Sequence, residues 1–254
     1  MTEPAERNRR SFNTPDVVAE YTELVGLVPC ETRMFETYVP TGSDVLDLGV
    51  GAGRTTPFLA ERAGRYVGVD YAERMVEYCR RQWPELEFHV EDAADLSRFD
   101  DRSFDAVVFS YNGLDTLHPD DARHACLDEI ARVLRSNGAF VFSRRNPRAL
   151  LEPPTGYGGA GVRPWTRQAV VSDLRRLLRA LSERSFWRGE GYTFSRIHGG
   201  LLSHLATPKR VRREVGSHGY VHRETVGVND PAPSPSRSTY WYYYAWTWPG
   251  PEPG

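Results

Sequence analysis

Residues 45–60 read VLDLGVGAGRTTPFLA, and this stretch predicts the fold of the chain. An apolar run ends in glycines at positions 49, 51 and 53, and a helical pattern follows, as where a buried strand turns tightly into a helix. The alternation continues to residue 143. The strands expected are 45–48, 66–69, 86–90, 104–110 and 139–143, and the helices between them are 54–63, 72–82 and 119–134. Such alternation predicts an α/β fold with a doubly wound parallel sheet, whose ligands bind at the carboxyl ends of the strands.

The flanking segments predict additions to this core. Thr14-Pro15-Asp16 is typical of a helix start, and a helix there places Val17, Val18 and Tyr21 on one stripe. Residues 146–163 are rich in proline and glycine and predict a loop. Beyond it we expect a helix at 166–185, two short strands within 191–205, a helix from 207 to Gly216 and an antiparallel pair at 220–228 and 240–248.

Composition predicts one independently folding unit. The chain has 254 residues, of which 40% are hydrophobic and 26% charged, so it can bury a core. Cys30, Cys79 and Cys126 are far apart and lack metal-ligand spacing, which disfavours a zinc site or a disulfide framework. No apolar run approaches the length of a membrane span, and no signal-peptide core follows the first residues. We therefore expect a cytoplasmic protein without a metal or a membrane partner.

Charge is unevenly distributed although the net charge is only -2. Residues 163–224 contain thirteen basic and five acidic residues, a balance of +8 that leaves -10 for the rest. Two interpretations stay open: a surface for an anionic substrate or RNA, and the solvated face of amphipathic helices, which we favour because arginines alternate with leucines in this region.

The glycine turn does not fit two common nucleotide-binding motifs. The third glycine of GxGxxG would fall at Arg54 or Thr56, and no GK[ST] occurs. The acidic-x-Gly-x-Gly-x-Gly pattern headed by Asp47 instead resembles motif I of the class I S-adenosylmethionine (SAM) methyltransferases. The resemblance implies a seven-stranded Rossmann-like sheet with an antiparallel last strand, an N-terminal lid and a substrate-covering insertion. Its four parts are residues 1–40, 41–145, 146–206 and 207–254, which form a single domain.

This resemblance implies a cofactor site made by the strand-to-helix turns. The glycines let the backbone pass beneath SAM, Asp47 faces its ammonium group or ordered water, and Asp70 accepts the ribose hydroxyls. Tyr71 and Met75 cover the adenine, and the Asp92-Ala93 pair takes its N6 and N1. The sulfonium lies near Ser110, Tyr111 and Asn112. The full expected set is Tyr21, Asp47, Gly49, Gly51, Gly53, Arg54, Asp70, Tyr71, Met75, Asp92, Ala93, Ser110 and Asn112.

The sequence says less about the substrate that accepts the methyl group. An amine can attack with little help, whereas a hydroxyl needs a base, and the candidate catalytic residues are His118, His198 and Tyr21, with His204 ranked lower. The NPPY-type signature of many nucleic-acid N-methyltransferases is absent. We expect transfer to N or O of a small molecule, as in specialised or antibiotic biosynthesis. An RNA or protein methyltransferase and a non-catalytic SAM-binding protein are the alternatives, and a homo-oligomer is left open.

Overall fold

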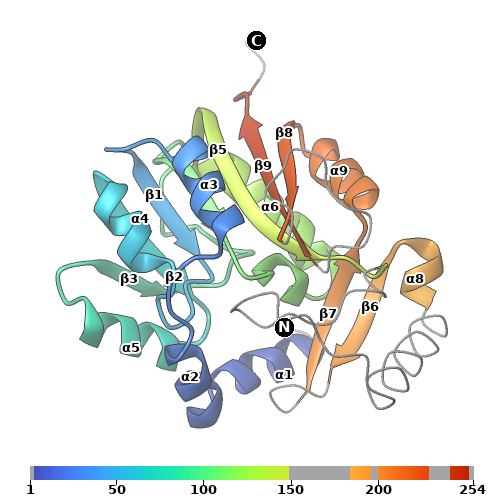
Figure 1. Cartoon of the computed structure of the whole chain (residues 1–254), viewed down its shortest axis with the longest axis horizontal. Helices are drawn as coiled ribbons and strands as arrows, with labels where there is room; N and C mark the ends of the chain where they lie inside the picture. The colour runs from blue at the N-terminus through green and yellow to red at the C-terminus, as the bar shows by residue number, and fades with distance from the viewer. Residues whose placement is uncertain (1–2, 149–183, 196–199, 229–240, 252–254) are drawn as a thin grey trace, which may run out of the picture.

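A computed structural model describes residues 3–148, 184–195, 200–228 and 241–251. Its main sheet has the strand order β3-β2-β1-β4-β5-β9-β8, in which β1 to β5 pair in parallel and the last two strands are antiparallel (Figure 1). These strands are β1 (Asp44–Leu48), β2 (Arg65–Asp70), β3 (Glu87–Val90), β4 (Phe104–Phe109), β5 (Leu134–Arg145), β8 (Val221–Gly227) and β9 (Trp241–Trp248). The predicted α/β class and sheet are confirmed.

Helices cover both faces of the sheet (Figure 1). One core holds side chains of α6 (Asp120–Val133) and α9 (Pro208–Ser217), and the other holds side chains of α3 (Pro29–Tyr38), α4 (Thr56–Arg62) and α5 (Glu73–Gln82). The predicted helices after the first, second and fourth strands and at 207 are confirmed, whereas α3 was not predicted. Strand β5 is longer than the predicted 139–143, because it pairs along most of its length with β9.

The aromatic run of β9 is interior to the sheet rather than at its edge. β9 lies between β5 and β8, and its residues 242–246 are buried. Tyr242 and Tyr244 pack into one core while Tyr243 packs into the other, as expected of a strand covered on both faces. The dense aromatics therefore serve core packing.

Two further groups lie at the carboxyl edge of the sheet. Helix α1 (Glu3–Phe12) lies beside the hairpin of β6 (Glu190–Ser195) and β7 (Leu201–Ala206) in Figure 1, and α2 (Pro15–Thr22) lies between α1 and α5. The helix predicted at Thr14-Pro15 and the two short strands are confirmed; α1 was not predicted. The short helix α8 (Arg184–Arg188) precedes the hairpin. The predicted helix at 166–185 falls almost entirely outside the described residues.

Candidate functional site

A pocket opens at the carboxyl ends of β1, β2 and β4, as predicted for a doubly wound sheet. Its volume is about 640 Å³ with its open mouth included. Eight residues of the expected cofactor set line it: Tyr21, Gly49, Gly51, Asp70, Tyr71, Met75, Ala93 and Ser110. Sequence reasoning missed Phe12, Glu91 and Phe109, which also line it.

The turn after β1 needs its glycines. Gly49, Gly51 and Gly53 have φ of +67°, +56° and +82°, a region that disfavours a side chain. A Cβ on Gly53 would lie 2.3 Å from the Trp83 ring. Gly53 thus allows the turn to pack against Trp83 on the side away from the pocket, while Gly49 and Gly51 line the pocket.

Asp70, the last residue of β2, links this strand to the turn after β1 by hydrogen bonds. Its Oδ2 accepts a hydrogen bond from the Gly51 amide at 2.9 Å, and its Oδ1 accepts one from the Ala72 amide at 2.8 Å. Each carboxylate oxygen has a second lone pair, so a pocket-lining Asp70 can still accept hydroxyl donors from a ligand. Burial raises the pKa of this carboxyl to about 6, against the opposing effect of the backbone amides.

The raised pKa of Asp70 predicts pH-dependent cofactor binding. Below about pH 6 the carboxyl is protonated and accepts hydroxyl donors poorly, so S-adenosylhomocysteine (SAH) affinity at pH 5 should be about tenfold lower than at pH 7.5. Titration calorimetry across this range measures it, with circular dichroism confirming that the protein is folded at each pH. A flat profile would contradict an ionised Asp70 as acceptor.

Asp47 is not brought to the pocket wall. Its carboxylate is 1% exposed, and its Oδ2 accepts hydrogen bonds from the Thr55 hydroxyl at 2.6 Å and the Tyr66 hydroxyl at 2.8 Å. Burial raises its pKa to about 6. Asp47 therefore stabilises the turn beneath the pocket through hydrogen bonds to Thr55 and Tyr66, and the expected direct contact with the ligand is not seen.

Arg54 is also turned away from the described pocket wall, by a carboxylate that sequence reasoning missed. Glu31 on α3 is fully buried and binds the Arg54 guanidinium at 2.6 and 2.7 Å. The Ser110 hydroxyl donates to the same carboxylate at 2.5 Å, and the Tyr243 hydroxyl donates to it as well. Burial opposes ionisation, but Arg54 and the hydroxyls hold the pKa of Glu31 below its usual value. This cluster holds the side chain of Ser110, which lines the pocket, in place.

The turn after β4 has an unusual backbone. Tyr111 and Asn112 have φ of +53° and +65°, a region that costs most residues free energy. The Ser143 hydroxyl accepts the Asn112 amide at 2.8 Å, and the Arg54 guanidinium lies 5.4 Å from the centre of the Tyr111 ring. These contacts hold the Tyr111 ring in the pocket wall, while Asn112 itself is buried behind it.

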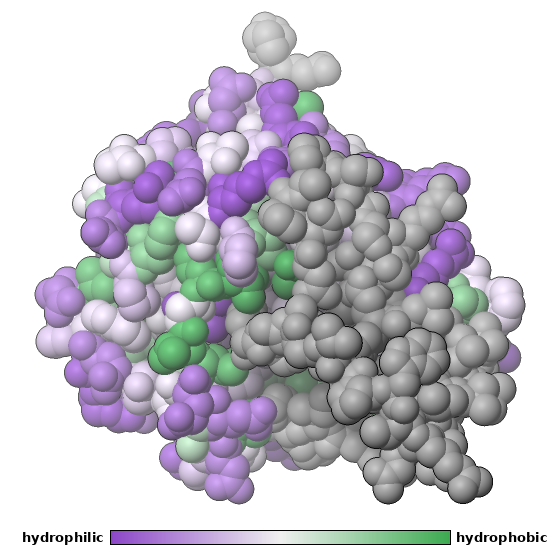
Figure 2. All heavy atoms as spheres, in the orientation of Figure 1, coloured by the Kyte–Doolittle hydropathy of each residue, from purple (hydrophilic) through white to green (hydrophobic). Residues whose placement is uncertain are grey.

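Aromatic rings surround the mouth of the pocket. Tyr21 on α2 meets Phe12 and Tyr111 edge to face, with ring centres 5.8 and 6.0 Å apart, and Phe12 meets Tyr71 at 6.1 Å. Burial raises the pKa of the Tyr21 phenol, so it stays protonated. Rings of this kind attract a cation such as a sulfonium. Figure 2 shows hydrophobic residues gathered over the segment between α2 and α3, where Val25 is 83% exposed.

Asn8 attaches α1 to two other segments beside the pocket through side-chain hydrogen bonds. Its side-chain amide donates to the carbonyls of Thr116 at 3.0 Å and Leu202 at 2.9 Å, and it accepts the Leu202 amide at 3.0 Å. The residue is 1% exposed although the helix is polar. Asn8 thus links the N-terminal helix to both β7 and the 3-10 helix η1 (Gly113–Thr116), and it holds Phe12 over the pocket.

Loss of the Asn8 contacts should loosen this cover. Asn8→Ala removes three hydrogen bonds and leaves the Leu202 backbone unpaired, so we expect SAH to dissociate about three- to tenfold faster. Stopped-flow displacement measures the rate. Glu6→Ala, an exposed position on the same helix, is the matched control, and equal rates for the two variants would show that α1 does not gate the pocket.

A second pocket adjoins the first and shares Tyr71, Thr116 and Leu117 with it. Asp92 and His118 line this second pocket. Asp92 is exposed and accepts the Ala94 amide at 3.0 Å, and the His118 ring lies 4.9 Å from that of Tyr192. Neither therefore lies in the wall of the first pocket. His198 lies outside the described residues.

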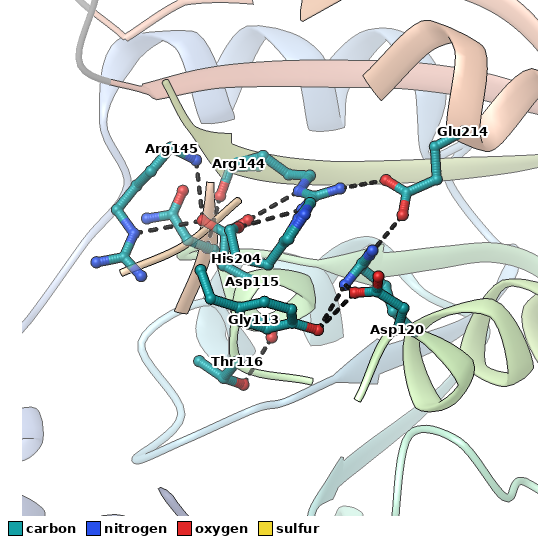
Figure 3. A network of polar contacts seen from close by, with 12 residues as sticks. Gly113, Asp115, Thr116, Asp120, Arg144, Arg145, His204 and Glu214 are labelled. Carbon is teal, nitrogen blue, oxygen red and sulfur yellow. Dashed lines mark hydrogen bonds and ion pairs between the residues drawn. The ribbon is translucent and has the colours of Figure 1, made fainter. Parts of the chain in front are cut away.

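His204 belongs to a buried polar network (Figure 3). The Arg144 guanidinium, fully buried, donates to His204 Nδ1 at 2.6 Å, to Asp115 at 2.8 Å and to Glu214 at 2.5 Å. Arg123 binds the other oxygen of Glu214. Burial, followed by the two arginines, lowers the pKa of His204 to about 3. His204 is consequently neutral with its Nδ1 occupied, which removes it as a general base through that atom.

The network joins elements that are distant in sequence. Asp115 lies on η1, Arg144 on β5, His204 on β7 and Glu214 on α9. The Arg144–His204 hydrogen bond attaches the hairpin, and the ion pairs of Arg144 attach α9, to the turn after β4, which lines the pocket. Within the described ranges, no group of three or more His, Cys, Asp or Glu is arranged to hold a metal, and no helix is long and apolar enough to cross a membrane.

Sequence comparisons identify related proteins. Residues 45–138 match a family described as a methyltransferase domain. A demethylmenaquinone methyltransferase of Clavibacter sepedonicus is 38% identical over 103 residues, which cover 39% of this chain and 40% of that protein. A fatty-acid O-methyltransferase of Mycolicibacterium smegmatis is 36% identical over 111 residues, which cover 42% of this chain and 39% of that protein. The chain thus spans about two fifths of the length of these two relatives.

A structural comparison extends the similarity beyond this core. The solved 1,6-didemethyltoxoflavin-N1-methyltransferase of Burkholderia thailandensis, with bound 1,6-didemethyltoxoflavin and SAH, covers 97% of this chain and 91% of its own. Its TM-score is 0.63 at 18% identity. At this identity the likeness establishes the fold.

Proposed function

We propose that this chain, which has the domain and the fold of the class I SAM-dependent methyltransferases, transfers a methyl group from SAM to a small molecule. The observation that carries the proposal is the pocket itself. Its wall combines a glycine turn, an Asp70 carboxylate with free lone pairs and a ring of aromatic side chains. These groups fit the ribose, the flat base and the cationic centre of SAM. The eight residues of the expected cofactor set that line the pocket are kept as ligand contacts, while Asp47, Gly53, Arg54 and Asn112 act behind the wall and Asp92 lines the adjoining pocket.

The chain's contribution to catalysis is binding, orientation and exclusion of water. SAM supplies an activated methyl group when bound. Asp70 and the amide of Gly51 fix one end of the site, and Tyr21, Phe12 and Tyr111 close the other. Asn8 holds α1 in place over them. We retain the N-terminal helices as a lid and the β6–β7 hairpin as part of the acceptor cover.

The pocket lining favours an amine as acceptor. Of the residues that the structure describes, aromatic rings and the carboxylates Asp70 and Glu91 line it, and no histidine does. A neutral amine attacks without a base, and aromatic rings suit a cationic amine during binding. We therefore favour N-methylation over O-methylation. A specialised biosynthetic pathway and a cytoplasmic location, consistent with three free buried cysteines, are parts of the same proposal.

A panel of acceptors tests this function. We expect SAH release with primary or secondary amines, at a rate that rises with pH as the acceptor amine loses its proton, and little release with phenols. Turnover confined to phenols and abolished by His198→Ala would contradict the amine preference. SAH binding with no turnover of any panel member would favour the non-catalytic SAM-binding protein.

A further inference from the structure

A basic groove is lined by residues of α8, of α9 and of the segment after β5. Helices α8 and α9 lie on the same side of the molecule in Figure 1. The groove extends over about 1520 Å³, open space included, and six cationic side chains line it. They are Arg148, Arg188, Lys209, Arg210, Arg212 and Arg213.

The charges of α9 are not explained by folding. Its first turn holds Lys209 and Arg210 and no acid, although the positive end of the helix dipole disfavours cations there. Its only carboxylate, Glu214, points inward to Arg123 and Arg144. The exposed face of this helix therefore presents cations alone, whereas a solvated face normally mixes both signs.

Little in the described structure neutralises these cations. One ion pair reaches the groove, from Glu190 to Arg210 at 3.2 Å. Arg148 donates to the backbone carbonyls of Phe186 and Trp187, which carry no charge. A groove with this excess of cations attracts an anion, and arginines bind phosphate oxygens bidentately.

Trp187 adds a flat apolar surface to the lining. Its side chain is 66% exposed, which is uncommon for so large an apolar residue. An exposed indole beside a cluster of arginines suits a ligand that has both phosphates and a ring, since the ring can stack while the phosphates pair. The indole packs edge to face against Phe186, with ring centres 5.0 Å apart, which fixes the orientation of the exposed ring.

The groove starts at the same edge of the sheet as the cofactor pocket. Asn146, the first residue after β5, and Tyr242, which pairs with Arg144 in the sheet, both line it. We propose that the groove binds the diphosphate and the ring of a nucleotide-type handle carried by the acceptor. This inference rests on the proposed function, since it assigns a second subsite to the same acceptor.

An extended RNA is a poorer fit than a small phosphorylated ligand. Several exposed or half-exposed arginines elsewhere are matched by carboxylates: Arg65 by Glu87, Arg98 by Glu91, Arg132 by Asp101 and Glu129, and Arg135 by Asp44 and Asp105. A backbone track for RNA requires a continuing line of available cations. Arg81 and Arg102 are also exposed and have no carboxylate partner among the described residues, but neither lines this groove, where five of the six cations lack such a partner.

Binding of ADP and inorganic pyrophosphate to the full chain at low salt tests the proposal. Calorimetry should give saturable binding of both without SAM, with ADP the tighter. Arg212→Gln/Arg213→Gln should weaken both at least about tenfold, and Trp187→Ala should remove the advantage of ADP. SAH affinity should stay within about twofold in these variants, so that a failure of this subsite is distinguished from a failure of the cofactor site.

A double variant at exposed arginines outside the groove, Arg81→Gln/Arg102→Gln, is the matched control and should bind both probes as the wild type does. Three outcomes would overturn the proposal. These are no saturable binding up to about 10 mM of either probe, an equal loss in the control, and binding of an oligoadenylate of about twelve nucleotides while ADP and pyrophosphate fail to bind.

Discussion

Asp70→Asn is expected to lower the affinity for SAH by at least about 100-fold while the protein stays folded. The substitution keeps the shape of the side chain but replaces one acceptor oxygen with an NH2 donor. Because both oxygens already accept backbone amides, from Gly51 and Ala72, the new donor must oppose one of them or face the ligand hydroxyls. A site built to accept hydrogen bonds and then left unpaired loses several kcal/mol, which is two or more orders of magnitude in affinity.

Calorimetry with SAH measures this effect, and a thermal melt checks folding. Asp100→Asn is the matched control, since Asp100 is an exposed carboxylate away from the pocket, and it should bind SAH like the wild type. Asp70→Ala should give a loss of the same order. Unchanged affinity in either Asp70 variant would show that the cofactor is not held at the end of β2.

Arg144→Met is expected to destabilise the fold by about 3–5 kcal/mol, because it leaves the buried Asp115 and the partly buried Glu214 without their main partner. Arg145 and Arg123 still reach these two acids and keep the loss within that range. Denaturant unfolding measures the free energy of unfolding. We also expect weaker SAH binding, since Asp115 positions the turn after β4.

Arg135→Met is the control for this prediction. Arg135 pairs with Asp44 and Asp105, each at 2.7 Å, but its side chain is 41% exposed. Exposed pairs contribute about 0–1 kcal/mol, so this variant should lose about 1 kcal/mol or less. Equal losses in the two arginine variants would contradict the view that burial makes the Arg144 network the main anchor of the hairpin and α9.

The sheet and half of the pocket were predictable because their signals are local. Strand β1 is an apolar run covered on both faces, and the glycines of the next turn are visible as a spaced motif. Asp70 was likewise predictable, because it directly follows the apolar run of β2. Periodicity and turn chemistry within a few residues encode all of this.

The missed residues depend on partners far along the chain. Glu31 lies on a helix whose composition is typical of a surface, and its burial depends on Arg54 and on Tyr243, 212 residues away. Asn8 similarly depends on Leu202. The burial of Arg144 was partly predictable, because Arg144 lies two residues after the buried Phe142 and therefore on the same face of β5. A charge in such a position indicates a buried partner, but the sequence does not say which.

Calorimetric titration of the wild-type chain with SAH is the decisive measurement of cofactor binding. We expect binding to a single site with a dissociation constant in the micromolar range, with no added metal and with affinity that falls below about pH 6 as Asp70 becomes protonated. Absence of binding at pH 7.5 by a folded protein would contradict both the methyltransferase function and the SAM-binding alternative.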